Sequence, residues 1–183
     1  MVKKRIHRAY RKSKYVIYRQ TILNPSDHFW TFLGAFIGIA SLGYLQGTQF
    51  GQTDNILLIG SFGATSVLIF GATNSPLAQP RNLIFGHLIS AFIGVLIYKL
   101  IPDNIWLSSA LAVSLSIVTM QITKTLHPPG GATALIANIG SEKIKALGFY
   151  YVLSPVLSGV LILFTVAVIV NNIPKNRSYP YKK

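Results

Sequence analysis

The sequence predicts an all-α membrane protein with about six membrane-embedded helical segments, arranged as two inverted three-helix repeats. Its 183 residues are 51% hydrophobic and only 11% charged, a balance outside the usual range of soluble domains. Five apolar stretches each approach the ~20 residues that a tilted helix needs to cross a bilayer. A Gly-Ala-Thr motif followed by an apolar run also occurs twice, at 63–65 and 131–133.

The apolar stretches are separated by segments rich in turn-forming residues. These segments read "GTQFGQTDN", "TNSPLAQPRN", "PDN" and "HPPGG" in chain order, and Gly, Pro, Asn and Asp are the residues that commonly end helices. The expected spans are 28–46, 56–73, 82–101, 104–123 and 148–170, with a sixth, shorter segment at 131–140. We expect the two segments that carry the Gly-Ala-Thr motifs to be broken or short.

The distribution of basic residues predicts which side the chain ends face. Twelve of the seventeen Lys and Arg residues lie in 1–20 and 173–183, and cytoplasmic segments are rich in these residues. Six crossings put fourteen of them inside and three outside; four crossings, with 56–73 and 131–140 re-entrant, put thirteen inside and four outside. Both counts satisfy the rule. Six is favoured because 56–73 is long enough to span and because of the repeat.

We expect a basic cytoplasmic tail at 1–24, a single transmembrane domain at 25–172 and a second basic cytoplasmic tail at 173–183. The net charge of +13 does not indicate nucleic-acid binding, because the basic residues flank apolar runs instead of covering a folded face. Such tails favour contact with anionic lipid. The chain contains no cysteine, which excludes disulfides and thiolate metal sites.

The repeat consists of two matched pairs of motifs. "SFGATSVLIF" at 61–70 matches "PGGATALIA" at 129–137, and "GVLI" follows 31 residues after Gly63 and 28 residues after Gly131. Three crossings in each half would make the second half run upside down, and inverted repeats place a substrate site near the midplane. Chance recurrence of short strings is the alternative. The expected halves are 28–101 and 104–170.

The stretch "KTLHPPGGATAL" at 124–135 predicts a helix start that faces an anion. A proline pushes the residue before it toward an extended conformation, and prolines suit the first helical positions. The first amides of a helix lack carbonyl partners within it, and in a bilayer its positive end favours an anion. Glycines leave such amides accessible. The residues expected to bind the anion here are His127, Pro128, Pro129, Gly130, Gly131, Ala132 and Thr133.

The first motif offers the same groups in Gly63, Ala64 and Thr65, so that two opposed helix starts could face one ion. Thr65 and Thr133 would add hydroxyl groups, and Ser61 and Ser66 are further donors. A cation pathway of the acidic kind is not expected, because the carboxylates lie outside or at the edges of the apolar runs. Those carboxylates are Asp27, Asp54, Asp103 and Glu142. The alternative role for the motif glycines is close helix packing, which we also expect for Gly34 and Gly38.

Basic residues beside the motifs would offset the cost of an anion inside the bilayer. We expect Arg81, Asn82, His87 and Lys124 to attract or gate the ion, and the histidines could couple its movement to a proton. Other roles remain open for these residues. Arg81 and Lys124 could be interface anchors that snorkel, and His87 could be a hydrogen-bonded packing residue.

Three stretches carry a resemblance to a known family. "GSFGATSVLIFGATNSPLAQPRN" at 60–82, "GH" at 86–87 and "TLHPPGGATALIA" at 125–137 resemble the HPP family of integral membrane proteins, whose His-Pro-Pro stands here at 127–129. The resemblance covers about 29–170. It implies a fold usually described with four spans, which differs from six. Members from plants and cyanobacteria are associated with nitrite transport, so the resemblance implies nitrite as the substrate.

The sequence therefore favours membrane transport of a small inorganic anion, nitrite by resemblance, through a midplane site made by helix N-termini. A membrane scaffold or sensor that does not transport is the alternative. An enzyme is not expected, because neither a nucleophile–base arrangement nor a carboxylate pair is visible, and no metal or cofactor is expected either. Short helices make a thin wall, which favours a homo-oligomer. We expect a multi-pass protein of the plasma (inner) membrane.

Overall fold

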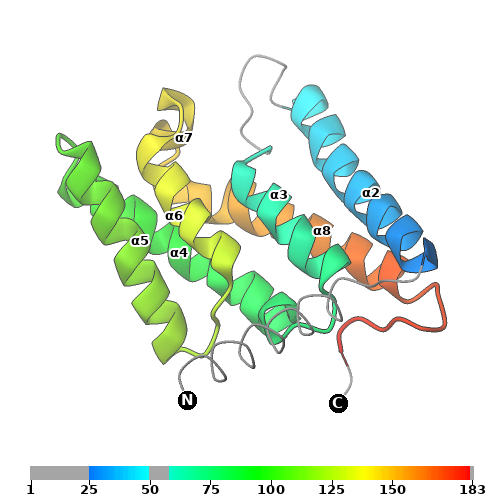
Figure 1. Cartoon of the computed structure of the whole chain (residues 1–183). Helices are drawn as coiled ribbons and strands as arrows, with labels where there is room; N and C mark the ends of the chain where they lie inside the picture. The colour runs from blue at the N-terminus through cyan, green and yellow to red at the C-terminus, as the bar shows by residue number, and fades with distance from the viewer. Residues whose placement is uncertain (1–24, 50–57, 182–183) are drawn as a thin grey trace, which may run out of the picture.

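The computed structural model describes residues 25–49 and 58–181, and every regular element in these ranges is helical (Figure 1). The all-α prediction is therefore confirmed for the described residues. The elements are α2 (Pro25–Gln49), α3 (Gly60–Ser66), η1 (Val67–Gly71), η2 (Pro76–Ala78), α4 (Pro80–Leu100), α5 (Ile105–Ile122), α6 (Pro128–Ile139), α7 (Glu142–Ala146), η3 (Val152–Leu157) and α8 (Ser158–Asn171). The π-helical turn η1 continues α3, and the π-helical turn η3 leads into α8.

Four helices in the described ranges are long and apolar enough to cross a membrane. They are α2, α4, α5 and the segment Val152–Asn171 that joins η3 to α8. The ends of α5 illustrate how the sequence sets these limits. The Asn104 side chain accepts a hydrogen bond from the Leu107 amide at its start. At its end Lys124 takes a positive φ of 56°, and the Thr125 amide reaches back to the Met120 carbonyl at 2.8 Å.

The expected spans at 56–73 and 131–140 are short helices in the structure. α3 and η1 together hold seven plus five residues, and α6 holds 12. At 1.5 Å per residue each reaches roughly 18 Å, whereas the hydrocarbon core is about 30 Å thick. Six full crossings are therefore not confirmed: among the described residues four helices are long enough to span, and these two segments are short.

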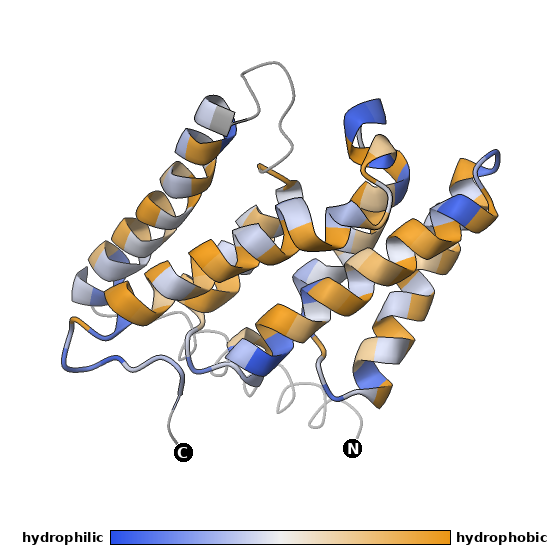
Figure 2. Cartoon of the chain, turned by 180° about the vertical axis from the view of Figure 1, so that it is seen from behind, coloured by the Kyte–Doolittle hydropathy of each residue, from blue (hydrophilic) through white to orange (hydrophobic). Residues whose placement is uncertain are grey.

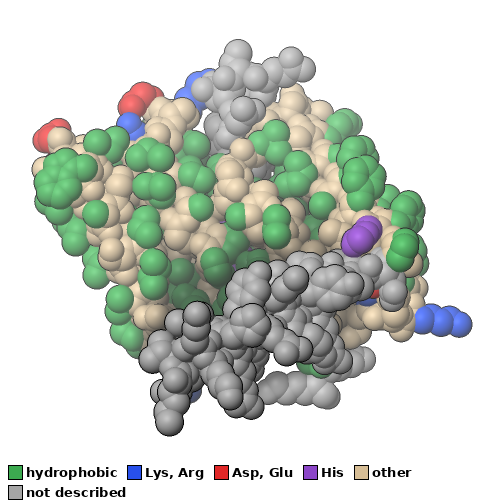
Figure 3. All heavy atoms as spheres, viewed as in Figure 1, with side chains coloured by type: hydrophobic (Ala, Val, Ile, Leu, Met, Phe, Trp, Pro, Cys, Tyr) green, Lys and Arg blue, Asp and Glu red, His purple; other side chains and the backbone are tan. Residues whose placement is uncertain are grey.

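Hydrophobic residues run along the helices (Figure 2), and many large hydrophobic side chains are exposed. On the face shown in Figure 3, hydrophobic side chains are spread over the helices while the charged ones lie near its edges. On α2 the exposed side chains include Phe29, Phe32 and Phe36, which recur about every turn on one side of the helix. Such a surface suits contact with lipid.

The two glycines of "GAFIG" provide room for an aromatic ring, in agreement with the packing role expected for them. A Cβ atom at Gly34 would collide with the Phe70 ring, and one at Gly38 would lie 3.0 Å from Leu163 Cδ2. Phe70 itself is fully buried. α2 thus packs closely against η1 and α8 at these glycines.

The glycines of the two "GVLI" motifs make a reciprocal pair of contacts. A Cβ at Gly94 of α4 would lie 2.7 Å from the Ala134 carbonyl oxygen of α6. A Cβ at Gly159 of α8 would collide with the Phe62 ring of α3. The GVLI glycine of each half therefore packs against the short helix that carries the Gly-Ala-Thr motif of the other half.

The residues after α8 fold back onto the helices. Arg177 lies beside Asp27, with its Nε atom 3.1 Å from Asp27 Oδ1 and side-chain exposures of only 7% and 14%. The same guanidinium donates to Thr31 Oγ1 at 2.7 Å and to Asn171 Oδ1 at 3.3 Å. This part of the segment expected as a tail thus ties the start of α2 to the end of α8.

Tyr179 anchors the same segment further along. Its ring is buried and its hydroxyl donates to the Ala78 carbonyl at 2.6 Å. Burial raises the pKa of the Tyr179 phenol, which keeps it protonated as a donor. The backbone amide of Tyr181 also donates to Gln79 Oε1 at 2.9 Å. Residues 177–181 therefore belong structurally to the transmembrane domain. The expected tail at 1–24 lies outside the described residues.

Replacing Arg177 by alanine should lower the stability of the protein in detergent by about 3 kcal/mol, because it leaves the poorly exposed Asp27 carboxylate without its cation. The measurement is thermal unfolding of purified variants. Lys175→Ala is the matched control, since Lys175 is an exposed cation of the same segment. Equal unfolding midpoints for the two variants would contradict an anchoring role for Arg177.

Candidate functional site

The His-Pro-Pro segment starts α6 as the sequence predicts. His127 has an extended backbone with φ −139° and ψ 104°, and Pro128 and Pro129 occupy the first helical positions. The Gly130 amide donates to the His127 carbonyl at 2.8 Å. The prolines therefore fix where the helix begins, and the helix start holds the His127 ring in the protein interior, fully buried.

Four buried polar side chains meet there. Thr65 Oγ1 lies 2.8 Å from His87 Nε2 and 3.2 Å from His127 Nε2. His87 Nδ1 lies 2.7 Å from Thr133 Oγ1. The two imidazole rings are 4.9 Å apart between centroids. All four side chains have zero exposure, and we call Thr65, His87, His127 and Thr133 the histidine–threonine cluster.

The cluster joins three helices and both sequence motifs. Thr65 of α3 and Thr133 of α6 are the threonines of the two Gly-Ala-Thr motifs, and His87 on α4 contacts both. Because Gly86 has no side chain, α4 can approach the segment that leads into α6: a Cβ at Gly86 would lie 2.9 Å from the Thr125 carbonyl oxygen. Four of the sequence-predicted residues are therefore brought together by side-chain hydrogen bonds.

Further groups hold the cluster in place. His127 Nδ1 lies 2.8 Å from the carbonyl oxygen of Leu77, which belongs to η2. Tyr151 is buried and donates from its hydroxyl to the Thr133 carbonyl at 3.1 Å. Sequence reasoning did not identify Tyr151 or Leu77. Their contacts are to and from backbone carbonyls, for which the sequence carries no signal.

Several of the backbone amides expected to bind an anion are engaged within the fold. α3 begins at Gly60, three residues before Gly63, so the amides of Ala64 and Thr65 already have carbonyl partners one turn earlier. In α6 the Gly130 amide is bonded to His127. Where the two motifs meet, the polar groups in contact are therefore mainly side chains and not backbone amides.

The motif glycines differ in what surrounds them. A Cβ at Gly130 would lie 2.7 Å from Ser90 Oγ and 2.9 Å from the Gly86 carbonyl oxygen, so Gly130 is a packing residue against α4. Nothing lies within 4 Å of a Cβ at Gly63, and Val113 is 3.8 Å from one at Gly131. Gly63 and Ala64 are exposed on α3, whereas Gly131 and Ala132 are half-buried.

The basic residues near the motifs lie outside the cluster. Arg81 is exposed and donates to the Thr123 carbonyl at 3.0 Å. Asn82 donates to the Leu126 carbonyl at 2.7 Å. Lys124 is exposed at the end of α5. Arg81 and Asn82 therefore hold the loop that leads into α6, and the histidines contribute the titratable groups of the cluster.

Several buried oxygen atoms have no protein hydrogen-bond partner in the described structure. They include Ser61 Oγ and Ser66 Oγ on α3 and Asn138 Oδ1 on α6. Ser61 precedes Thr65 by one helical turn and so lies on the same side of α3. Buried polar atoms normally have a partner, and these atoms provide hydrogen-bonding capacity that the protein itself does not use, which for Ser61 lies on the Thr65 side of α3.

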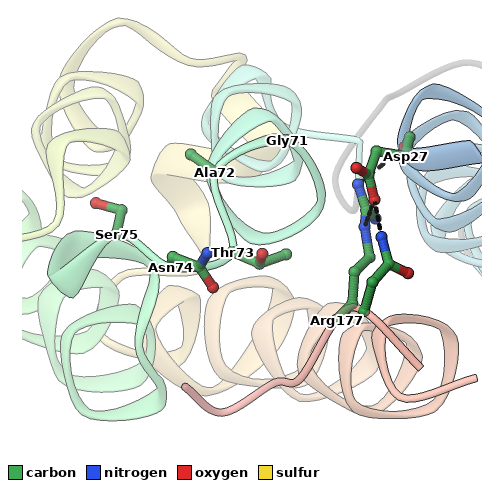
Figure 4. A pocket seen from close by; sticks show the side chains of 8 residues that line it. Asp27, Gly71, Ala72, Thr73, Asn74, Ser75 and Arg177 are labelled. Carbon is green, nitrogen blue, oxygen red and sulfur yellow. Dashed lines mark hydrogen bonds and ion pairs between the residues drawn. The ribbon is translucent and has the colours of Figure 1, made fainter. Parts of the chain in front are cut away.

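A second polar feature is a cleft of about 660 Å³ lined by Asp27, residues 71–75, Asn176 and Arg177 (Figure 4). Asn176 and Arg177 both donate to Asp27 Oδ1, at 2.9 and 3.1 Å. The Arg177 charge is thus balanced by Asp27. This cleft is a weaker anion site than its arginine alone would indicate.

Comparison with known proteins identifies the family. The family model described as "HPP, transmembrane region" matches residues 20–180. The chain belongs to the HPP family. It is 49% identical over 154 residues to two Dictyostelium discoideum proteins, each named only as a transmembrane protein.

Those matches cover 82% of this chain but only 54% and 49% of the relatives, so the chain spans about half the length of the curated relatives it matches. No solved structure matches. As an HPP protein with four apolar helices of spanning length, it is an integral membrane protein. The family description and the relatives' names indicate no enzymatic reaction. No group of three or more metal-ligating side chains occurs in the described ranges.

Two neighbouring glycines should respond differently to alanine. Gly130→Ala should destabilise the protein by about 1–3 kcal/mol, because its new methyl group would overlap Ser90 and the Gly86 backbone. Gly131→Ala should leave stability unchanged or higher, because its methyl group meets only Val113 at ordinary contact distance. Thermal unfolding in detergent measures both. A Gly131 variant as unstable as the Gly130 variant would show that the packing described for α6 is wrong.

Proposed function

We propose that this HPP protein transports a small inorganic anion across the membrane, and that nitrite is its substrate. The observation that carries the proposal is the meeting of Thr65 and Thr133, from matching positions of the two motifs, on the two nitrogens of His87. A buried polar cluster inside an apolar helical domain is costly. A substrate pathway through the cluster would explain why the protein keeps these polar groups buried.

The proposal includes an inverted repeat of the two halves. α3 and α6 run in opposite directions past one another in Figure 1, as the short helices of inverted halves would. The reciprocal packing of Gly94 on α6 and Gly159 on α3 also supports this symmetry. In transporters built this way, short or broken helices meet at a midplane substrate site.

The chemistry near the cluster favours an anion. Hydroxyl groups and imidazole N–H groups can donate hydrogen bonds to an oxyanion in place of those they make to one another, and the Ser61 and Ser66 hydroxyls are without protein partners. The described carboxylates lie elsewhere, with Asp27 paired to Arg177 and Glu142 paired to Lys145. In this proposal the side chains of the cluster replace the backbone amides as the main groups that bind the ion.

Nitrite is chosen by family resemblance, because plant and cyanobacterial members are associated with its transport. We further propose that both chain ends are cytoplasmic, that the protein resides in the plasma membrane, and that it works as a homo-oligomer in contact with anionic lipid. The concentration of Lys and Arg at the chain ends supports the first of these points.

Uptake by proteoliposomes tests the proposal, with nitrite compared against nitrate, formate and chloride. Thr65→Val and Thr133→Val keep the side-chain shape but remove the hydroxyl, and each should reduce nitrite uptake about tenfold, the value of one hydrogen bond. Thr65→Ser and Thr133→Ser keep the hydroxyl and should retain uptake. Folded protein is quantified for every variant, so that a loss of stability is not taken for a loss of transport.

Thr165→Val is the matched control, because Thr165 is an exposed residue of α8 whose hydroxyl bonds only to the Leu161 carbonyl of its own helix among the described contacts. It should transport like the wild type. If the folded wild-type protein moves none of the four anions in either direction, the transport proposal is wrong and the scaffold or sensor function is favoured.

A further inference from the structure

We propose that the histidine–threonine cluster binds a single proton by reversing a chain of hydrogen bonds, and that this proton supplies the positive charge for the transported anion. The inference deepens the proposed function and rests on it only for the anion. The proton-binding step is argued from the partners of each atom in the cluster.

One hydrogen in the cluster is fixed by geometry. His127 Nδ1 lies 2.8 Å from the Leu77 carbonyl oxygen, which can only accept a hydrogen bond. His127 Nδ1 therefore carries a hydrogen in every state. When the ring is neutral, His127 Nε2 has no hydrogen and must accept one.

In the neutral state this requirement sets the direction of the whole chain. Thr65 has one hydroxyl hydrogen and must donate it to His127 Nε2, so His87 Nε2 must donate to Thr65 Oγ1. His87 Nδ1 is then bare and accepts from the Thr133 hydroxyl at 2.7 Å. The chain runs from Thr133 through His87 and Thr65 to His127, with every donor used once.

A second arrangement accommodates one more proton at the same heavy-atom positions. His127 Nε2 now carries a hydrogen and donates to Thr65 Oγ1, and Thr65 donates to His87 Nε2. His87 Nδ1 donates to Thr133 Oγ1, and the Thr133 hydroxyl turns to the Pro129 carbonyl, which lies 3.3 Å away. Every donor again has its own acceptor.

The change between the two states balances as a series of proton shifts. The Thr65 hydrogen moves to His127 Nε2, the His87 Nε2 hydrogen moves to Thr65, and the Thr133 hydrogen moves to His87 Nδ1. A proton from water replaces the one that Thr133 has given up. One proton enters at Thr133, and the positive charge appears on the His127 ring.

The surroundings leave that charge without a fixed counter-charge. The Phe62 ring of α3 lies beside the cluster, with its centroid 5.7 Å from that of the His87 ring. Tyr151, in the segment before α8, donates its hydroxyl hydrogen to the Thr133 carbonyl. Arg81 and Lys124, between α4, α5 and α6, are exposed cations outside the cluster. Among the described residues, the carboxylates of Asp27 and Glu142 are bonded elsewhere, and Asp103 lies in the loop after α4.

An anion would therefore be the partner of the protonated cluster. A buried cation without a counter-charge is strongly disfavoured, and an anion beside it stabilises both charges. By linkage, proton binding must raise the affinity for the anion by the same factor that the anion raises the affinity for the proton. A neutral proton–anion pair is also the least costly form to hold inside a bilayer.

Nitrogen NMR of ¹⁵N-histidine-labelled protein in lipid nanodiscs tests the proton-binding step on the wild-type chain. At high pH we expect opposite tautomers, with the hydrogen on Nδ1 of His127 and on Nε2 of His87. Acidification should protonate both nitrogens of His127 and move the His87 hydrogen to Nδ1. His127→Gln and His87→Gln assign the signals, and His28→Gln on the exposed start of α2 is the matched control.

The same tautomer in both rings at high pH, or an unchanged His87 tautomer while His127 is protonated, would overturn the inference. A pH-sensitive dye inside proteoliposomes then tests coupling to nitrite, with protein-free liposomes as the baseline for nitrous acid leakage. We expect proton entry with nitrite in the wild type and its loss in His127→Gln. Nitrite flux without proton entry would overturn the coupling and leave transport intact. The tautomer switch without flux of any anion would uphold proton binding and contradict the proposed function.

Discussion

Polar groups inside a membrane domain must find their partners within the protein, and this requirement governs the arrangement of the short helices. Lipid cannot hydrogen-bond a free carbonyl, and the short helix formed by α3 and η1 ends at Gly71, directly after the fully buried Phe70. Side chains from other elements bond the carbonyls there and in the following turn. The pairs are Asn171 with Ile69, Thr31 with Phe70, His127 with Leu77, and Tyr179 with Ala78.

These pairs explain why distant parts of the chain converge. Thr31 belongs to α2, Asn171 to α8, and Tyr179 to the segment after α8, so the end of one short helix organises both ends of the described structure. The carbonyls of the loop before α6 also accept hydrogen bonds from side chains. Arg81 donates to the Thr123 carbonyl and Asn82 to the Leu126 carbonyl. His127 has two roles, since one nitrogen satisfies the Leu77 carbonyl and the other completes the cluster.

The sequence allowed the helical class, the long helices and the start of α6 to be predicted, because apolar length and proline chemistry are local properties. It did not allow the role of residues 177–181 to be predicted, because a run with Lys175 and Arg177 looks like any cytoplasmic tail until Asp27 is known to lie beside it. Thr65, His87, His127 and Thr133 were all identified as candidates. That they touch one another depends on the crossing of α3, α4 and α6, which motif spacing does not specify.

The spacing of a motif along the sequence does not show how each of its glycines is packed. The glycines at 130 and 131 look equivalent, but Gly130 is packed on α4 and Gly131 is open toward Val113. A helix that starts three residues before Gly63 likewise removes the amides of its motif from the helix end. What both motifs do share in three dimensions is the threonine, whose hydroxyl in each case reaches His87.

The charges of the protein point to the interior cluster, and away from the cleft at Asp27 and Arg177, as the place where an anion would matter most. In the cleft Arg177 is already neutralised by Asp27 and held by four acceptor atoms, so an added anion would compete with a carboxylate that is part of the fold. The cluster carries no fixed charge, but its two rings can acquire one. An anion there would complete a charge pair that the protein alone leaves incomplete.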